Sequence, residues 1–229
     1  MRVLALDAAT EACSVALLSG DEMFGRYEEL RRGSAEQVLA MVEAVLADAQ
    51  LSLVQLDGIA ASIGPGAFTG VRISVAVAQG LAFGAGLPVT PVTTLEALAL
   101  RAVRRGAARV LACLDARMGE VYWGCFDADS RRGVAAANAP RVGPPGGVMP
   151  PNPGPYRGIG RGFAAYPTLA ALPGLELHPE DGQALPDARE IARLGGLRLA
   201  LSEGIDPADL QPLYLRDKVA LTEAERALK

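Results

Sequence analysis

Apolar residues along the chain form two patterns, short unbroken runs and stripes that recur every three to four positions. The apolar runs predict β-strands at residues 2–8, 12–18, 56–63, 88–92, 110–116 and 120–126, and residues 23–30 are a candidate for a further strand beside the first two. The stripes predict helices at residues 34–50, 69–83, 94–103 and 187–202. Because the first three strands follow one another directly, we expect an α/β fold that opens as an antiparallel meander.

Three of the expected helices begin with a capping signal. Ser34 and Gln37 stand in the spacing of a capping box, in which each side chain bonds the other residue's backbone N–H. Thr69 and Thr94 each precede an apolar-periodic segment, and a threonine hydroxyl accepts a bond from an otherwise unpaired N–H group. We therefore expect these residues to mark the helix starts.

The stretch from Ile63 to Gly86 holds the most apolar of these helices, behind a loop of glycine and proline. Small residues recur in it at every fourth position, at Gly70, Ser74, Ala78 and Ala82. Larger apolar side chains occupy most of the remaining circumference, and Arg72 and Gln79 form its only polar seam. A helix without a polar face is either buried in its own domain or covered by a partner.

The opening of the chain recurs near its middle. A strand that ends in Asp7 and is followed by a turn and a second strand is matched by a strand that ends in Asp115. We interpret this as two related domains, residues 1–103 and 104–229, of which the second is degenerate. Proline and glycine gather at residues 130–158, where we expect a surface excursion without regular helix or central strand.

The composition excludes several kinds of chemistry. The 229 residues are 50% hydrophobic with a net charge of −4, so the core is ample and the chain is a poor stand-alone binder of phosphate backbones. Lysine occurs only at Lys218 and Lys229, and His178 is the single histidine. These scarcities argue against Schiff-base catalysis, a Walker-type lysine and a His–His metal site.

The cysteines and the longest uncharged segment bear on the compartment. Cysteine occurs at three well-separated positions, which is typical of small buried hydrophobes in a reducing cytoplasm. Residues 73–95 lack charge over a length that spans a bilayer, but Pro88 and Pro91 interrupt them. We expect a buried helix followed by a strand, no membrane span, and a cytoplasmic protein.

Two loops are candidate sites for a nucleotide or another anion, and each has a structural alternative. Asp7 and Asp115, with Thr10 beside the first, either orient phosphate and magnesium or close their own turns. Gly64, Gly66 and Thr69 lie before a helix N-terminus, which attracts anions, but the glycines also suit a tight turn and close helix packing. The residues alone leave both alternatives open.

Four segments carry a family resemblance, and they read RVLALDAATEACSVAL, SIGPGAFTGVRISVAVAQGLA, LDARMGEVYW and PLYLR. Together they resemble the bacterial TsaB (YeaZ) family of tRNA threonylcarbamoyladenosine biosynthesis proteins, in the same order and over nearly the whole chain. The resemblance implies two actin-like (ASKHA, RNase H-like) domains with mixed sheets. It also implies a non-catalytic subunit that works with the catalytic TsaD and the ATPase TsaE. Their complex transfers threonylcarbamoyl to the adenosine 3′ of the anticodon in tRNAs that read codons beginning with A.

The resemblance also implies how the subunit pairs. Family members use first-domain helices both for homodimers and for TsaD, which gives as expected interface residues Val38, Met41, Val42, Val45, Arg72, Ser74, Val75, Ala78, Gln79 and Ala82. The HxxxH metal pair of TsaD is absent here, so we expect no metal, no catalytic residue and no stably bound cofactor. ATP and magnesium would act through the partners, and tRNA would be contacted indirectly. The alternative is an independent ATP-dependent phosphotransferase or ATPase of the actin-like class.

Overall fold

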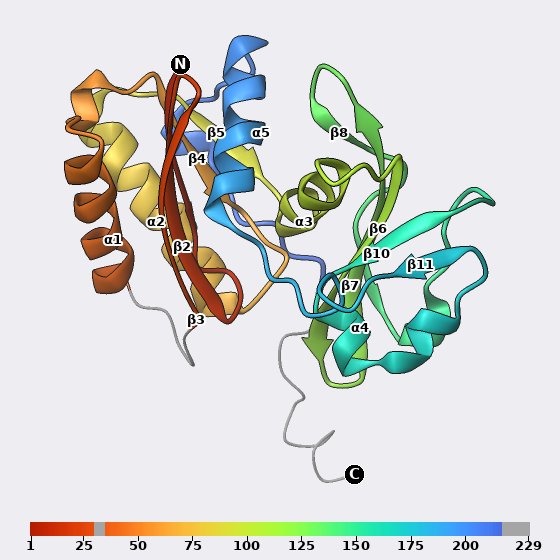
Figure 1. The fold of residues 1–229 in the computed structure, drawn as a ribbon. Coiled ribbons are helices and arrows are strands. Elements are labelled where there is room, and N and C mark those ends of the chain that lie inside the picture. Colours follow the sequence, from red (N-terminus) through yellow and green to blue (C-terminus); the bar gives the residue numbers. More distant parts are fainter. Residues whose placement is uncertain (30–34, 217–229) are drawn as a thin grey trace, which may run out of the picture.

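The computed structural model describes residues 1–29 and 35–216, which form two mixed sheets with helices between and outside them (Figure 1). The first sheet has five strands in the order β3-β2-β1-β4-β5. Their bounds are β1 Arg2–Asp7, β2 Ala12–Ser19, β3 Glu22–Glu29, β4 Gly58–Ser62 and β5 Val89–Val92. The first three strands are antiparallel neighbours, which confirms the expected meander, and β4 and β5 run parallel to β1.

The second sheet repeats this arrangement. Its strand order is β11-β10-β6-β7-β8, with β9 paired to β7, so a meander is again followed by parallel strands on the other side of its first strand. The bounds are β6 Arg109–Arg117, β7 Glu120–Asp129, β8 Gly133–Ala136, β9 Arg141–Gly143, β10 Tyr156–Ile159 and β11 Leu175–Leu177. The shared order confirms the repeat of Asp7 by Asp115: Asp7 is the last residue of its sheet's central strand, and Asp115 lies two residues before the end of its own.

The expectation for residues 130–158 is wrong in one respect. The excursion contains β8 and β9, and its last residues enter β10, which lies between β11 and β6 rather than at an edge. Proline removes a ladder donor, but β10 begins directly after Pro155 and contains none. The proline-rich part therefore stops where the central strand starts.

The helices form layers on the sheets. They are α1 Ala35–Asp48, α2 Phe68–Ala85, α3 Thr94–Val103, α4 Gly162–Ala165 and α5 Ala188–Ala200, with 3-10 turns at Leu53–Gln55, Pro145–Gly147, Pro167–Ala171 and Pro207–Asp209. α1 and α2 cover one face of the first sheet, whereas α5 covers the other face (Figure 1). α3 and α5 pack side by side, and their apolar residues join both sheets in one core. By length and composition α2 passes for a membrane-crossing helix, with 39% of its 18-residue window buried.

The linear domain boundary near residue 103 divides the two sheets but misplaces α5. This helix follows β11 in the chain, yet it packs on β1, β2 and β4 of the first sheet. Gly195 permits the approach, because a side chain there would lie 2.4 Å from the Ala60 methyl. The N–H of Ala188 also donates to Ser14 Oγ at 2.9 Å. The chain thus returns to complete the first domain.

Two of the three expected helix caps require comment. α2 begins at Phe68 with Ala67 as its N-cap and no side-chain cap, so the cap expected at Thr69 is wrong. α3 is capped one residue earlier than expected, by Thr93, whose hydroxyl accepts from the N–H of Glu96 in a capping box. The capping box expected at Ser34 lies outside the described residues.

Candidate functional site at the interdomain cleft

A cleft of about 1060 Å³ separates the two domains. Its first wall is the β1–β2 turn and the start of α2, and its second wall is the β6–β7 hairpin and α4. The segment after the last 3-10 turn crosses it and contributes Leu213, Tyr214 and Arg216. Among the expected anion-site residues, those that line the cleft are Thr10, Gly66, Thr69 and Asp115, whereas Asp7 and Gly64 do not.

Asp7 is fully buried at the end of β1. Burial raises the pKa of Asp7 to about 6, although the bond from the N–H of Ala9 partly opposes this. Its Oδ1 accepts from Ala9 N at 3.0 Å, so the carboxyl group closes its own turn. This geometry supports the structural alternative for Asp7.

The other amides of the first turn are also used within the chain. Ala8 N donates to Ser74 Oγ at 2.8 Å, and Ala12 N donates to Thr10 Oγ1 at 3.3 Å. A phosphate loop needs several N–H groups that point at the ligand. Here three of the amides already have acceptors, which does not fit a phosphate cradle.

The glycines before α2 serve close packing. A side chain at Gly66 would lie 2.1 Å from the Ala9 carbonyl oxygen, and one at Gly70 would lie 2.0 Å from that of Ala8. Ala67 N donates to the Ala9 oxygen at 2.7 Å across the same contact. Only residues without Cβ let the start of α2 lie against the turn, which supports the packing alternative.

Gly64 has a comparable structural role. Its φ of +96° lies in the region that favours glycine. Its carbonyl oxygen accepts from Thr94 N at 2.9 Å, which ties the loop to the start of α3. Thr69, by contrast, is exposed on the cleft wall.

The second turn differs because its aspartate is partly exposed. Asp115 Oδ1 accepts from Arg117 N at 2.8 Å and from the Tyr166 hydroxyl at 3.4 Å. Its Oδ2 lies 2.9 Å from Arg117 Nη1. Asp115 therefore closes its turn as Asp7 does, and it also holds an arginine at the cleft.

Ion pairs connect the walls of the cleft. Arg117 of the second domain pairs with Glu11 of the first, and Arg216 of the crossing segment pairs with Glu120. These arginines are matched by carboxylates, so the cleft is not a strongly cationic pocket. Among the residues that the structure describes, no group of three His, Cys, Asp or Glu side chains is placed to hold a metal ion.

A second contact brings together residues that the sequence did not join. Arg72 Nε donates to the Tyr214 hydroxyl at 2.8 Å, and its guanidinium lies 3.7 Å from the centre of the Phe68 ring. The two rings are 5.6 Å apart. With Glu11 and Arg117, these residues come from all four segments that carried the family resemblance, so those segments meet at one cleft.

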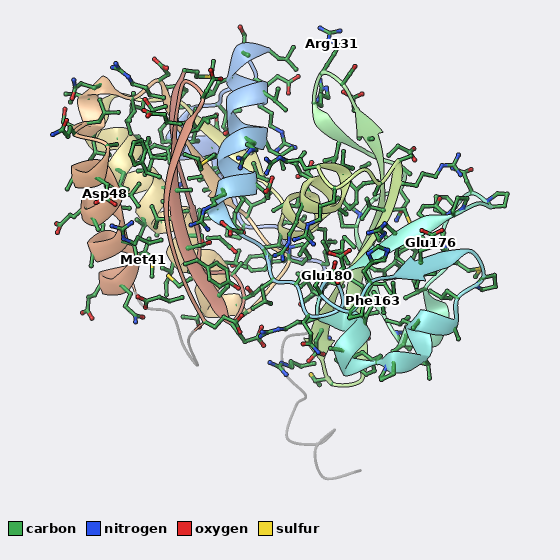
Figure 2. All side chains as sticks on the ribbon, in the orientation of Figure 1. Met41, Asp48, Arg131, Phe163, Glu176 and Glu180 are labelled. Atoms are coloured by element: carbon green, nitrogen blue, oxygen red, sulfur yellow. The ribbon has the colours of Figure 1, made fainter. Side chains whose placement is uncertain are left out.

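The expected interface residues lie mostly inside the chain, which corrects that assignment. On α1 the inward residues are Val38, Met41, Val42 and Val45, and Met41 lies on the side that faces the sheet (Figure 2). On α2 the buried residues are Ser74, Val75, Ala78 and Ala82, because the small side chains let α2 pack closely on the sheet. Gln79 donates to the carbonyl oxygens of Pro207 and Leu210 at 2.9 and 3.2 Å. Arg72 alone of the set is exposed.

The fold and cleft define a two-domain α/β protein of the actin-like class. The family model described as TsaD, tRNA N6-adenosine threonylcarbamoyltransferase, matches residues 28–140. The chain is 39% identical to the tRNA threonylcarbamoyladenosine biosynthesis protein TsaB of Escherichia coli over 225 residues, which are 96% of each chain. The protein of that name from Haemophilus influenzae is 36% identical, with 96% of this chain and 95% of the relative covered.

A solved structure described as YeaZ from Pseudomonas aeruginosa agrees with these relatives. It is 41% identical, has a TM-score of 0.86, and covers 93% of this chain and 99% of its own. The chain belongs to the TsaB (YeaZ) family.

Proposed function

We propose that this protein is a non-catalytic, partner-binding subunit for threonylcarbamoyl transfer to the adenosine 3′ of the anticodon, in tRNAs that read codons beginning with A. It acts in the cytoplasm with a TsaD-type catalytic subunit and a TsaE-type ATPase, which use the ATP and magnesium. In isolation it forms a homodimer. The names of its TsaB relatives support the pathway.

The outer surface of α2 is the observation that carries the pairing role. Its exposed residues are Phe68, Thr69, Arg72, Ala76, Gly80, Phe83 and Gly84. The Phe83 side chain is 60% exposed, and Leu39 on the neighbouring α1 is 42% exposed. Small residues beside exposed apolar side chains allow another helix to approach closely, which is typical of a helix–helix interface. We therefore assign pairing to this outer surface.

The alternative, an independent ATPase or phosphotransferase, is favoured by the cleft itself, which lies where two actin-like domains face each other. Against it, the first turn directs its amides inward and the cleft arginines already have carboxylate partners. We therefore place the reaction in the partner rather than in this chain.

Two arginine substitutions on α2 test the pairing role. Ala76 is exposed and Ala78 is fully buried, so Ala76→Arg and Ala78→Arg place the same side chain on opposite sides of one helix. Ala76→Arg is expected to leave the monomer folded and to abolish its association with itself and with the catalytic subunit. Ala78→Arg is expected to prevent folding, because an unpaired charge would enter the core. Size-exclusion chromatography with light scattering measures both outcomes, and a folded Ala76→Arg protein that still associates would contradict the assignment.

A further inference from the structure

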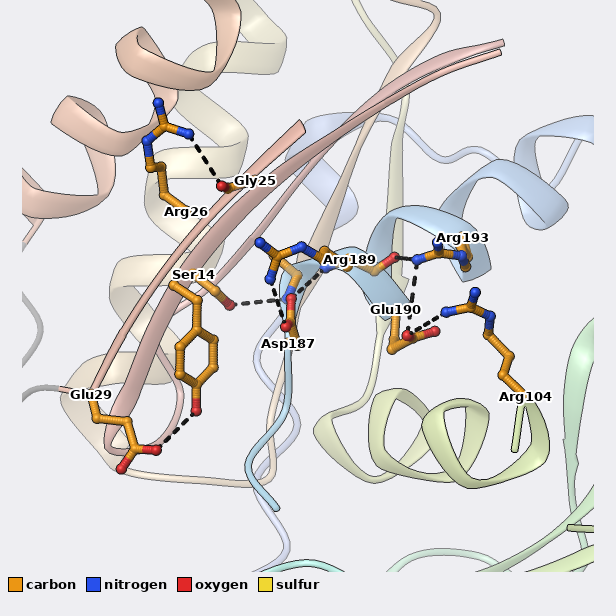
Figure 3. Close-up of polar contacts among 11 residues, drawn as sticks. Ser14, Gly25, Arg26, Glu29, Arg104, Asp187, Arg189, Glu190 and Arg193 are labelled. Carbon is orange, nitrogen blue, oxygen red and sulfur yellow. Dashed lines mark hydrogen bonds and ion pairs between the residues drawn. The ribbon is translucent and has the colours of Figure 1, made fainter. Parts of the chain in front are cut away.

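A row of arginines follows the seam between α3 and α5. Arg101 lies in the last turn of α3, Arg104 and Arg105 follow it, and Arg189 and Arg193 stand on α5. Figure 3 shows Arg104 reaching from α3 toward Glu190 and Arg193 on α5. This seam lies on the side of the first sheet opposite α1 and α2, so it stays free when the outer surface of α2 binds a partner.

Carboxylates along this seam lie beneath the arginines. The side chains of Glu190 and Asp181 are only 10% and 0% exposed, whereas those of Arg104 and Arg105, which they bind, are 47% and 44% exposed. A guanidinium has five N–H donors, and each of these ion pairs uses one arginine nitrogen. In these two ion pairs the carboxylate is therefore buried and the arginine faces solvent, whereas Asp187, which pairs with Arg189 at 3.0 Å, is 19% exposed.

The cations in this row also outnumber their anionic partners. Arg193 donates to the Arg189 carbonyl oxygen at 3.1 Å and approaches Glu190 only to 3.9 Å. Arg101 has no ion pair among the described residues. The pKa of Arg193 is lowered by burial and further by the positive charge of Arg104 and Arg189, although Glu190 and Asp187 oppose this. An anion at the seam would relieve that repulsion.

The β7–β8 turn extends the row across the domain junction. Arg131 is exposed at the tip of this turn (Figure 2). Gly133, the first residue of β8, lies against α3 and α5, since a side chain there would be 3.0 Å from Leu100 and 3.3 Å from Leu194. We group these cations as the arginine face, formed by Arg101, Arg104, Arg105, Arg189 and Arg193 at the seam and by Arg131 at the tip of the neighbouring turn.

We propose that the arginine face binds the phosphate backbone of RNA, and that the RNA is the tRNA substrate. The identity of the RNA rests on the proposed function. Guanidinium forks match phosphate oxygens, and a group of cations on one surface matches the repeated negative charge of a phosphate backbone. Arg104, Arg105 and Arg131 are exposed, and Arg101, Arg189 and Arg193 are half-buried. The net charge of −4 predicts only indirect tRNA contact, but two of the exposed acidic residues, Glu36 and Glu43, lie on α1, on the other face of the first sheet from the α3–α5 seam.

The test uses two arginines that hold little else in place. Arg101→Gln/Arg193→Gln removes two charges from the arginine face and leaves the ion pairs of Arg104 and Arg105 intact. Arg26→Gln with Arg2→Gln is the control with the same change of net charge, because neither residue belongs to the arginine face. The thermal midpoints of both variants are measured first to verify folding.

Binding of an unmodified tRNA transcript is then titrated by fluorescence anisotropy at several salt concentrations, with the chain alone and with its catalytic partner. The arginine-face variant is expected to bind about tenfold more weakly at low salt, and the slope of log affinity against log salt is expected to fall by about 2. The control variant is expected to bind like the wild type.

Three results would overturn the inference. The first is that the wild type binds no tRNA, either alone or with its catalytic partner. The second is that the control variant loses as much tRNA affinity as the arginine-face variant. The third is that polyglutamate competes for the site as well as tRNA does, which would indicate an acidic protein as the ligand. Pairing with the catalytic subunit is followed in parallel by size exclusion. If the arginine-face variant pairs with the catalytic subunit and binds tRNA like the wild type, this inference alone is refuted. If the wild type itself does not pair with the catalytic subunit, the proposed function is refuted.

Discussion

The two domains share a strand order but differ in the helices that cover them. In the first domain β4 leads through a glycine loop into α2, which has 18 residues, and in the second domain β10 leads through a similar loop into α4, which has four. In both loops a glycine packs against a backbone carbonyl of the central strand or of the turn that follows it. A side chain at Gly66 would lie 2.1 Å from the Ala9 oxygen, and one at Gly160 would lie 2.2 Å from the Cys113 oxygen.

This difference separates what the repeat retains from what it loses. Both domains retain the sheet, the aspartate turn and the glycine contact, which are needed to build the fold. Among the described residues, only the first domain keeps long helices on its outer face, and these supply the surface that we assign to pairing. The glycine loop is therefore needed to build the fold of both domains, whereas α2, which follows it in the first domain, supplies the surface that we assign to pairing.

The largest expected effect comes from a methyl group in the first glycine contact. Gly70→Ala places Cβ 2.0 Å from the Ala8 carbonyl oxygen, so α2 must shift on the sheet. We expect a loss of about 3 kcal/mol or more in the free energy of unfolding. Gly80→Ala, in the same helix with no atom within 4 Å of its added Cβ, is expected to gain about 0.5 to 1 kcal/mol. Urea unfolding measures both, and equal stabilities would show that the contact between α2 and the β1–β2 turn does not need glycine at position 70.

The second effect separates the two aspartates by pH. Burial raises the pKa of Asp7 in the folded protein to about 6, whereas the ordinary pKa of an exposed Asp is 3.8. Stability from this group is therefore present below about pH 4 and is lost as the pH rises through 6. Asp7→Asn removes this loss and is expected to gain up to about 3 kcal/mol above pH 7 relative to the wild type.

The control for this measurement is Asp115→Asn in the partly exposed second turn. It is expected to change the unfolding free energy by less than about 1 kcal/mol, because its ion pair with Arg117 is largely solvated. A parallel pH dependence in the wild type and Asp7→Asn would contradict the assignment of the low-pH stabilisation to Asp7.

The smallest expected effect concerns the ion pair that joins the domains. Glu11 and Arg117 are 41% and 70% exposed, so solvent screens their interaction. A double-mutant cycle of Glu11→Gln and Arg117→Gln is expected to give a coupling energy below about 1 kcal/mol that shrinks with salt. The pair Arg26 and Asp48, within the first domain and similarly exposed, is the matched cycle. A coupling above about 2 kcal/mol across the cleft would mean that this contact fixes the domain arrangement.

Local pattern predicted the sheets well and the helix faces poorly. β1 and β2 were predicted to within one residue because unbroken apolar runs mark buried strands. α2 is apolar around most of its circumference, so its pattern does not tell which side meets the sheet, and the small-residue line that was assigned to a partner packs inward. Close packing on a sheet and close packing on another helix require the same small side chains.

The contacts at the cleft could not be predicted from local sequence patterns, for a different reason. Arg72 and Tyr214 are 142 positions apart, and only the return of the chain through α5 brings them together. The aspartate turns were found from the repeat, but periodicity carries no information on whether their amides point inward. That distinction depends on Ser74, which accepts the Ala8 N–H from the neighbouring helix.

The claim that this chain acts through a partner rather than through its own nucleotide chemistry is tested most directly by calorimetry. The isolated chain is titrated with ATP and Mg²⁺, and separately with the TsaD-type catalytic subunit. We predict no heat of binding with ATP and Mg²⁺ and a saturable heat with the catalytic subunit. Saturable binding of ATP and Mg²⁺ together with no heat from the catalytic subunit would contradict the account.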